Sequence, residues 1–119
     1  MLKKILVAAS LGALMFSAQA AEKIRVGTEP TFAPFEFMET KTNTITGFDI
    51  DLIKAVGTKA GYEVEVQSMG FDALIPALKT GAIDVAAAGI SITEERKKAV
   101  DFTTPYYESG LAYMTLKKN

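Results

Sequence analysis

Alternation of apolar and polar residues predicts several strands after residue 20. Lys23–Thr28 (KIRVGT) alternates, and residues 62–69 (YEVEVQSM) do so strictly, which is typical of a half-buried strand. Residues 82–91 (AIDVAAAGIS) form a run of small and apolar residues, which predicts a buried strand. Residues 109–116 (SGLAYMTL) predict a last apolar strand.

A different spacing predicts helices between these strands. Residues 47–61 carry apolar side chains at nearly helical spacing, and Gly61 suits the position after a helix end. Residues 71–81 predict a short helix, in which Pro76 stands near the start, where N–H groups lack partners within the helix. A third helix, containing Arg96, follows residue 93. Residues 38–46 (METKTNTIT) are polar and predict a surface loop.

The order strand, helix, strand, helix, strand, helix predicts an α/β fold with a parallel sheet and helices on both faces. In such sheets ligands bind beyond the carboxyl ends of the strands. The segments that follow the predicted strands are residues 29–32, 69–71 and 89–96. A ligand site is therefore expected where these three segments meet.

The first 20 residues predict an export signal. Two lysines precede an apolar run from Ile5 to Phe16, and a small-x-small cleavage site ends at Ala20. The run is too short for a membrane-spanning helix, which needs about 20 apolar residues. We expect cleavage near Ala20 and export to a periplasm or cell surface.

Composition excludes several kinds of chemistry. The chain has no cysteine and no histidine, which removes thiolate chemistry, the commonest metal ligand and the commonest general base. Without the signal, 11 of the 13 basic residues remain against 14 acidic ones, so a nucleic-acid partner is not expected. We expect one small exported domain over residues 21–119 that is not an enzyme and carries no cofactor or metal.

Aromatic and acidic residues stand in the expected site segments. Phe32 and Phe71 offer flat faces that would sandwich a small ligand, and each lies near a carboxylate, Glu29 or Asp72. The alternative is that both rings belong to the core. Gly89 allows close approach of the backbone to a ligand, or it simply forms a turn.

Arg96 is out of place for a helix start. With Thr93 as N-cap it is the third helical residue, where a cation is unfavourable by about 0.3–1 kcal/mol. The first turn also offers free N–H donors, a ready anion site. A guanidinium there matches a carboxylate, and each charge-assisted hydrogen bond contributes roughly 1.5–3 kcal/mol. The alternatives are a solvated Arg96 beside two lysines and a purely capping Ser91.

Long stretches of the chain resemble a known family. FAPFEF, GFDIDLIKAVGTKA and residues 71–110 (FDALIPALKTGAIDVAAAGISITEERKKAVDFTTPYYESG) are similar, in this order, to bacterial extracellular solute-binding proteins of the polar amino acid family. These proteins are periplasmic receptors that feed ABC importers through an inner-membrane permease. The resemblance covers nearly all of the chain after the signal and is nearest to the glutamine and basic amino acid branches.

The resemblance implies a two-lobed fold that closes on one free amino acid. It implies that Arg96 pairs with the ligand α-carboxylate, and that Gly89 and Ser91 bind its α-groups. Phe32 and Phe71 would hold the ligand side chain, and Glu29 would face its far end. Ala88 and Gly89 replace the serines frequent in basic amino acid receptors, which favours glutamine slightly.

The family is roughly twice as long, so residues 21–119 correspond to the N-terminal part of the first lobe, ending at the hinge strand. We therefore expect millimolar rather than micromolar binding, because the second lobe contributes about half of roughly −8 kcal/mol. Two alternatives remain: a ligand-sensing module of a signalling receptor, and a periplasmic dehydratase on the same fold. In the dehydratase, Glu29 or Glu36 would serve as a general acid.

Overall fold

The computed structural model describes residues 20–118. The expected export signal, Ala20 excepted, lies outside the described residues. Within this range the chain forms nine elements: β1 (Lys23–Thr28), β2 (Thr31–Phe32), β3 (Glu36–Glu39), β4 (Thr44–Thr46), α1 (Phe48–Lys59), β5 (Glu63–Ser68), α2 (Phe71–Thr80), β6 (Val85–Ala86) and α3 (Glu94–Lys97). None of the helices in residues 20–118 combines the length and apolar character that crossing a membrane requires.

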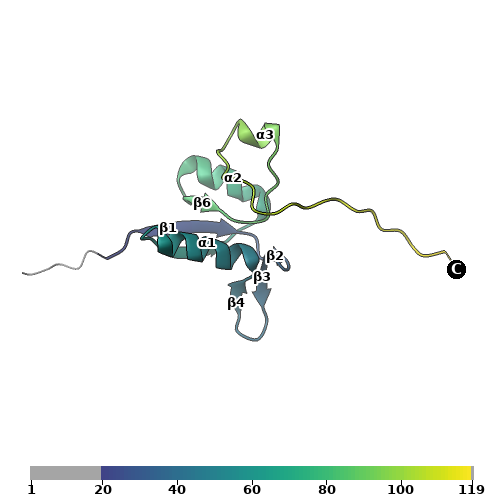
Figure 1. The fold of residues 1–119 in the computed structure, drawn as a ribbon, viewed down its shortest axis with the longest axis horizontal. Helices are drawn as coiled ribbons and strands as arrows, with labels where there is room; N and C mark the ends of the chain where they lie inside the picture. Colours follow the sequence, from purple (N-terminus) through teal and green to yellow (C-terminus); the bar gives the residue numbers. More distant parts are fainter. Residues whose placement is uncertain (1–19, 119) are drawn as a thin grey trace, which may run out of the picture.

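The larger structural unit is a parallel sheet with strand order β5-β1-β6 (Figure 1). β1 pairs with β5 over its whole length, from Lys23↔Glu63 to Thr28↔Ser68. It pairs with β6 only at Val26 and Gly27. The parallel arrangement confirms the α/β fold predicted from the alternating element types.

The two long helices cover opposite faces of this sheet. An added Cβ at Gly57 of α1 would overlap Val64 and face Ile24. An added Cβ at Gly27 would instead lie 2.6 Å from Ile83 Cδ1 and 3.1 Å from Leu74 Cδ2, on the α2 side. Successive residues of a strand point to opposite faces, so α1 packs on the face of Ile24 and α2 on that of Gly27.

One cluster of the buried core lies under α2. Leu74, Ile83 and Ala88 are its buried members, and partly buried side chains surround them, including Met69, Leu78 and Ile90. α2 ends at Gly81, which has the left-handed conformation (φ 76°) typical of a helix C-cap. Pro76 is the sixth residue of α2, so it lies beyond the first turn, where N–H groups lack partners within the helix, and not near the helix start as predicted.

A second, antiparallel sheet of order β2-β3-β4 corrects the prediction of a surface loop over residues 38–46. β3 and β4 form a hairpin in the register Met38↔Ile45, which projects from the main sheet in Figure 1. Asn43 has φ 51°, a conformation that asparagine tolerates well and that a turn requires. The polar run is therefore a turn with two short strands.

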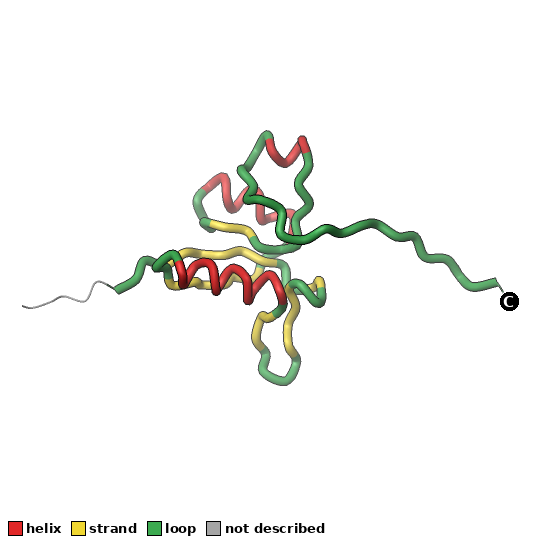
Figure 2. The backbone as a smooth tube through the Cα atoms, viewed as in Figure 1, coloured by secondary structure: helices red, strands yellow, loops and turns green. Residues whose placement is uncertain are grey.

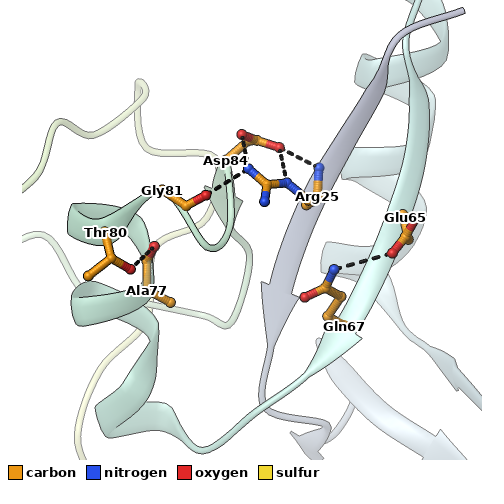
Figure 3. Close-up of polar contacts among 7 residues, drawn as sticks. All are labelled: Arg25, Glu65, Gln67, Ala77, Thr80, Gly81 and Asp84. Carbon is orange, nitrogen blue, oxygen red and sulfur yellow. Dashed lines mark hydrogen bonds and ion pairs between the residues drawn. The ribbon is translucent and has the colours of Figure 1, made fainter.

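β6 is shorter and more exposed than predicted, because a side chain occupies part of its place beside β1. The N–H of Arg25 donates to Asp84 Oδ2 (2.8 Å), and the Arg25 guanidinium donates to both Asp84 carboxylate oxygens (3.0 Å each). Arg25 Nη2 also donates to the Gly81 carbonyl (2.7 Å), so this cluster joins β1 to the end of α2 (Figure 3).

The predicted last strand, residues 109–116, is wrong for this structure. Residues 101–118 contain no strand, and beyond Tyr107 the segment runs away from the two sheets (Figure 2). The apolar side chains of Leu111, Tyr113, Met114 and Leu116 are almost fully exposed. An apolar pattern makes a strand only where a neighbouring strand supplies hydrogen bonds, and residues 20–118 offer this segment none.

Candidate functional site

Two hollows lie at the carboxyl ends of the parallel strands, where the site was expected. The smaller, about 220 Å³, is lined by Glu29, Thr31, Phe32, Glu36, Phe71 and Gly89. The larger, about 520 Å³, is lined by Phe71, Asp72, Ile75, Thr93, Glu95, Arg96 and Ala99. Phe71 belongs to both, so the two hollows adjoin. Five of the six predicted site residues line one or the other, whereas Ser91 lines neither.

Arg96 is held in place by two contacts. Its guanidinium carbon lies 5.5 Å from the centre of the Phe71 ring, and Nη1 donates to the Ser91 carbonyl oxygen (3.0 Å). Within residues 20–118, none of the ion pairs includes Arg96. A guanidinium has five N–H donors, so most of them remain available to an anion in the larger hollow.

The helix that carries Arg96 is a single turn, which corrects the argument from the helix dipole. α3 has four residues, and one turn has only a small dipole. Thr93 is the N-cap, as predicted, and its Oγ1 accepts from the Arg96 N–H (3.1 Å). The capping role therefore falls to Thr93 rather than to Ser91. The position of Arg96 is explained by its contacts with Phe71 and Ser91, not by the dipole.

The two aromatic residues of the site lie outside the core. Phe32 is 51% exposed and Phe71 37% exposed. Phe32 stacks on Phe35 with ring centres 5.5 Å apart and an angle of 20° between the planes. The Phe32 ring is thus packed against Phe35, and the exposed parts of Phe32 and Phe71 line the smaller hollow.

Gly89 forms the wall of the smaller hollow opposite Glu29 with its backbone. It has φ 54°, and an added Cβ would lie 3.2 Å from the Phe32 ring and 3.7 Å from Glu36 Oε1. Its N–H donates to Asp49 Oδ2 (2.7 Å), a bond that crosses 40 residues of sequence. A side chain at this position would be both strained and crowded.

Sequence reasoning missed two acids beside this wall, Glu36 as a lining residue and Asp49 behind it. They are 1% and 2% exposed, and Glu36 Oε2 and Asp49 Oδ1 have no hydrogen-bond partner among the described residues. The signal available in the sequence was an acid flanked by apolar residues in both FEF and FDI. Such positions predict burial, and a buried carboxyl group needs a partner or a proton.

Burial raises the pKa of Glu36 to about 8, and the neighbouring carboxyl group of Asp49 and the charge of Glu29 add to the shift. Burial also raises the pKa of Tyr106, with smaller contributions from Asp49 and Glu36. Tyr106 comes from the segment after α3, and its ring lies 6.1 Å from that of Phe48. This segment therefore contributes Tyr106 to the acidic cluster.

Relatives with known names match most of this chain. A probable histidine-binding protein of Campylobacter jejuni is 47% identical over 96 residues, which are 81% of this chain and 37% of that protein. ABC transporter arginine-binding protein 1 of Escherichia coli is 44% identical over 116 residues, which are 98% of this chain and 47% of that protein. The chain spans less than half the length of these relatives.

A solved structure gives the same answer for the fold. The arginine-bound form of domain 1 from the T. maritima protein TmArgBP is 46% identical, with a TM-score of 0.69. The match covers 71% of this chain and 67% of that one. Residues 24–119 match the family described as bacterial extracellular solute-binding proteins, family 3. The chain belongs to this family of bacterial extracellular solute-binding proteins.

Proposed function

We propose that this chain binds a free polar amino acid outside the cytoplasm, for delivery to an ABC importer through its permease. The observation that carries the proposal is the placement of opposite charges across Phe71. Arg96 lines the hollow on one side, and Glu29 lines the hollow on the other. A zwitterion with a polar or cationic side chain matches this arrangement, because its carboxylate and its side-chain end need opposite partners.

The ligand would lie across both hollows. Its α-carboxylate would accept from the free donors of Arg96, in the bidentate geometry that a guanidinium favours. Gly89 and Ser91 would contact its α-groups, and its side chain would lie between Phe32 and Phe71. Glu29 would receive the far end of that side chain. Five of these six residues line the two hollows, and Ser91, which lines neither, would have to reach the ligand from beside them.

A basic amino acid fits better than glutamine. Glu29 lines the smaller hollow, and none of the ion pairs within residues 20–118 neutralises its carboxyl group. A guanidinium or ammonium group would compensate Glu29, whereas an amide would not. The relatives named above for arginine and histidine support this preference, and glutamine remains the second candidate.

We further propose that residues 21–119 form the N-terminal part of one lobe of a two-lobed receptor, after removal of residues 1–20 in the periplasm. The relative whose domain 1 was solved with arginine bound supports the idea that one lobe holds a ligand. The contacts of the second lobe are absent from the described residues. We therefore expect a dissociation constant of about millimolar, roughly −4 kcal/mol.

Titration calorimetry with a matched pair of ligands tests the proposal. Arginine should bind, whereas agmatine, which is arginine without its α-carboxylate, should bind at least about tenfold more weakly, because the Arg96 contact is lost. Lysine, histidine and glutamine complete the series. Equal affinity for arginine and agmatine, or no binding of any amino acid, would contradict the proposal.

Two further observations separate the alternative functions, the dehydratase and the sensory module, from the proposed one. A dehydratase would convert prephenate-like acids, and a turnover assay with such acids should show no product if the chain is a binding protein. A sensory module would bind the same ligand, so a full reading frame containing a kinase or membrane segment would favour it.

A further inference from the structure

Asp49 joins the start of α1 to the wall of the smaller hollow. It is the second residue of α1, after the N-cap Gly47, and is 2% exposed. Its Oδ2 accepts from the Gly89 N–H at 2.7 Å. Hydrogen bonds to carboxylate groups are generally stronger than those between neutral groups, so this contact is one of the stronger ones available to the segment around Gly89.

Gly89 has little room to move without altering the hollow. Its left-handed φ of 54° directs the missing side chain at the Phe32 ring, and Glu36 Oε1 lies next beyond it. The Gly89 backbone is thus fixed from one side by Phe32 and from the other by Asp49. A displacement would change the surface that meets the ligand α-groups in the proposed function.

Other acidic groups surround Asp49. Glu36 approaches it from β3 and Tyr106 from the segment after α3, and Glu29, from the segment after β1, lies close enough to Glu36 to act on its charge. None of the three ion pairs within residues 20–118 involves any of these four residues. Two adjacent buried carboxylates repel each other strongly unless one of them holds a proton.

We propose that Asp49 is a positioning residue, which holds the Gly89 amide in the ligand hollow, and that a proton kept on Glu36 allows it to do so. This inference rests on the proposed function only in identifying the hollow as the ligand site. Ionisation of Glu36 places a second charge beside Asp49. The pair then separates, and the Gly89 amide loses part of its hold.

Amide hydrogen exchange read by NMR on the whole chain tests the first half. In Asp49→Ala the Gly89 amide should exchange at least about tenfold faster, because its acceptor is gone, and arginine affinity should fall by about the same factor. Asp49→Asn keeps an acceptor oxygen and should remain within about threefold of wild type. Asp51→Ala, on the same first turn but exposed, is the matched control and should change neither quantity.

Titration of the Glu36 carboxyl carbon by NMR tests the second half and needs no ligand. Its midpoint should lie near pH 8 in the wild-type chain and fall in Asp49→Asn, because the charge of Asp49 is removed. Exchange of the Gly89 amide should quicken as pH passes that midpoint, beyond the ordinary increase seen at Gly70. An unchanged midpoint in Asp49→Asn would overturn the inference, even if Asp49→Ala fails to fold.

Other outcomes separate this inference from the proposed function. Unchanged Gly89 exchange or unchanged affinity in folded Asp49→Ala would overturn the inference alone. If the wild-type chain bound no amino acid while Gly89 exchange behaved as expected, the proposed function would be overturned and the positioning of Gly89 would stand.

Discussion

The Arg96 guanidinium lies over the face of the Phe71 ring, with 5.5 Å between its central carbon and the ring centre. A planar cation over an aromatic face is favourable by about 0.5–1 kcal/mol at an exposed site. Together with the bond to the Ser91 carbonyl, this contact limits the orientations of the guanidinium before any ligand arrives. An oriented fork loses less entropy when it binds a carboxylate.

Arg96→Lys should weaken arginine binding by at least about tenfold, because an ammonium keeps the charge but loses the planar fork. Thermal stability should change little, since none of the ion pairs in residues 20–118 uses Arg96. Calorimetry and a melting curve on the same sample check both parts. Lys98→Arg, the reverse exchange two residues further on, is the control. Equal affinity in Arg96→Lys would show that the fork does not meet the ligand.

Stability should fall as pH rises from about 5 to about 8, because of Glu36. Its folded pKa of about 8 lies above the ordinary value of 4.5, so the folded chain binds more protons than the unfolded chain in this range. The stabilisation from Glu36 is therefore complete at pH values below its ordinary pKa and is lost as pH rises through its folded pKa. The free energy of unfolding falls by at most about 1.4 kcal/mol per pH unit in this range. Urea unfolding at several pH values should show a flatter profile for Glu36→Gln. Parallel profiles would contradict the assignment, and Glu39→Gln, exposed on the same strand, is the control.

The opposite pH dependence is expected from Asp84. Hydrogen bonds from the Arg25 side chain and backbone lower the pKa of Asp84 below its ordinary 3.8. Its contribution is present above that value and is lost as pH falls through the lowered folded pKa. Asp84→Asn should therefore melt at a lower temperature than wild type at pH 7, and the difference should shrink in strong acid. Asp51→Asn should show no such convergence; a constant difference for Asp84→Asn would argue against the ion pair.

Gly57→Ala should destabilise the chain even though alanine is the better helix former by about 1 kcal/mol. The added methyl would overlap Val64 Cγ2 where α1 packs on β5, and overpacking typically costs about 1–3 kcal/mol. Adding Val64→Ala should recover part of the lost stability. The free energy of unfolding of the double mutant should therefore be higher, by at least about 0.5 kcal/mol, than the sum of the two single effects predicts. A more stable Gly57→Ala would show that the helix moves freely on the sheet.

Periodicity was sufficient to predict the main sheet and its helices. β1 was predicted with its observed bounds, and α1, β5 and α2 within a few residues, because each buries a side-chain pattern of its own period. The hairpin β3–β4 was missed because its strands are polar and its turn depends on the left-handed Asn43. The segment 109–116 has a strand-like pattern, but its state depends on pairing, which a local pattern does not report.

The site was predictable in part. The rule that ligands bind beyond the carboxyl ends of parallel strands brought five named residues to two adjoining hollows. The pair formed by Glu36 and Asp49 was not predictable, because the two acids lie 13 positions apart and meet only when β3 packs beside α1. The one-turn length of α3 could not be predicted from the sequence either, because a capping residue indicates where a helix begins and not where it ends.

The backbone wall at Gly89 limits how the candidate site can be altered. Any side chain at position 89 would meet the Phe32 ring, so Gly89 cannot be substituted to change the shape of the hollow. Any attempt to redesign the ligand preference has to begin on the facing wall, with Glu29 and Thr31. A library randomised at those two positions would select for binding of ligands with different side-chain ends. The proposed contacts with the ligand α-groups would stay unchanged.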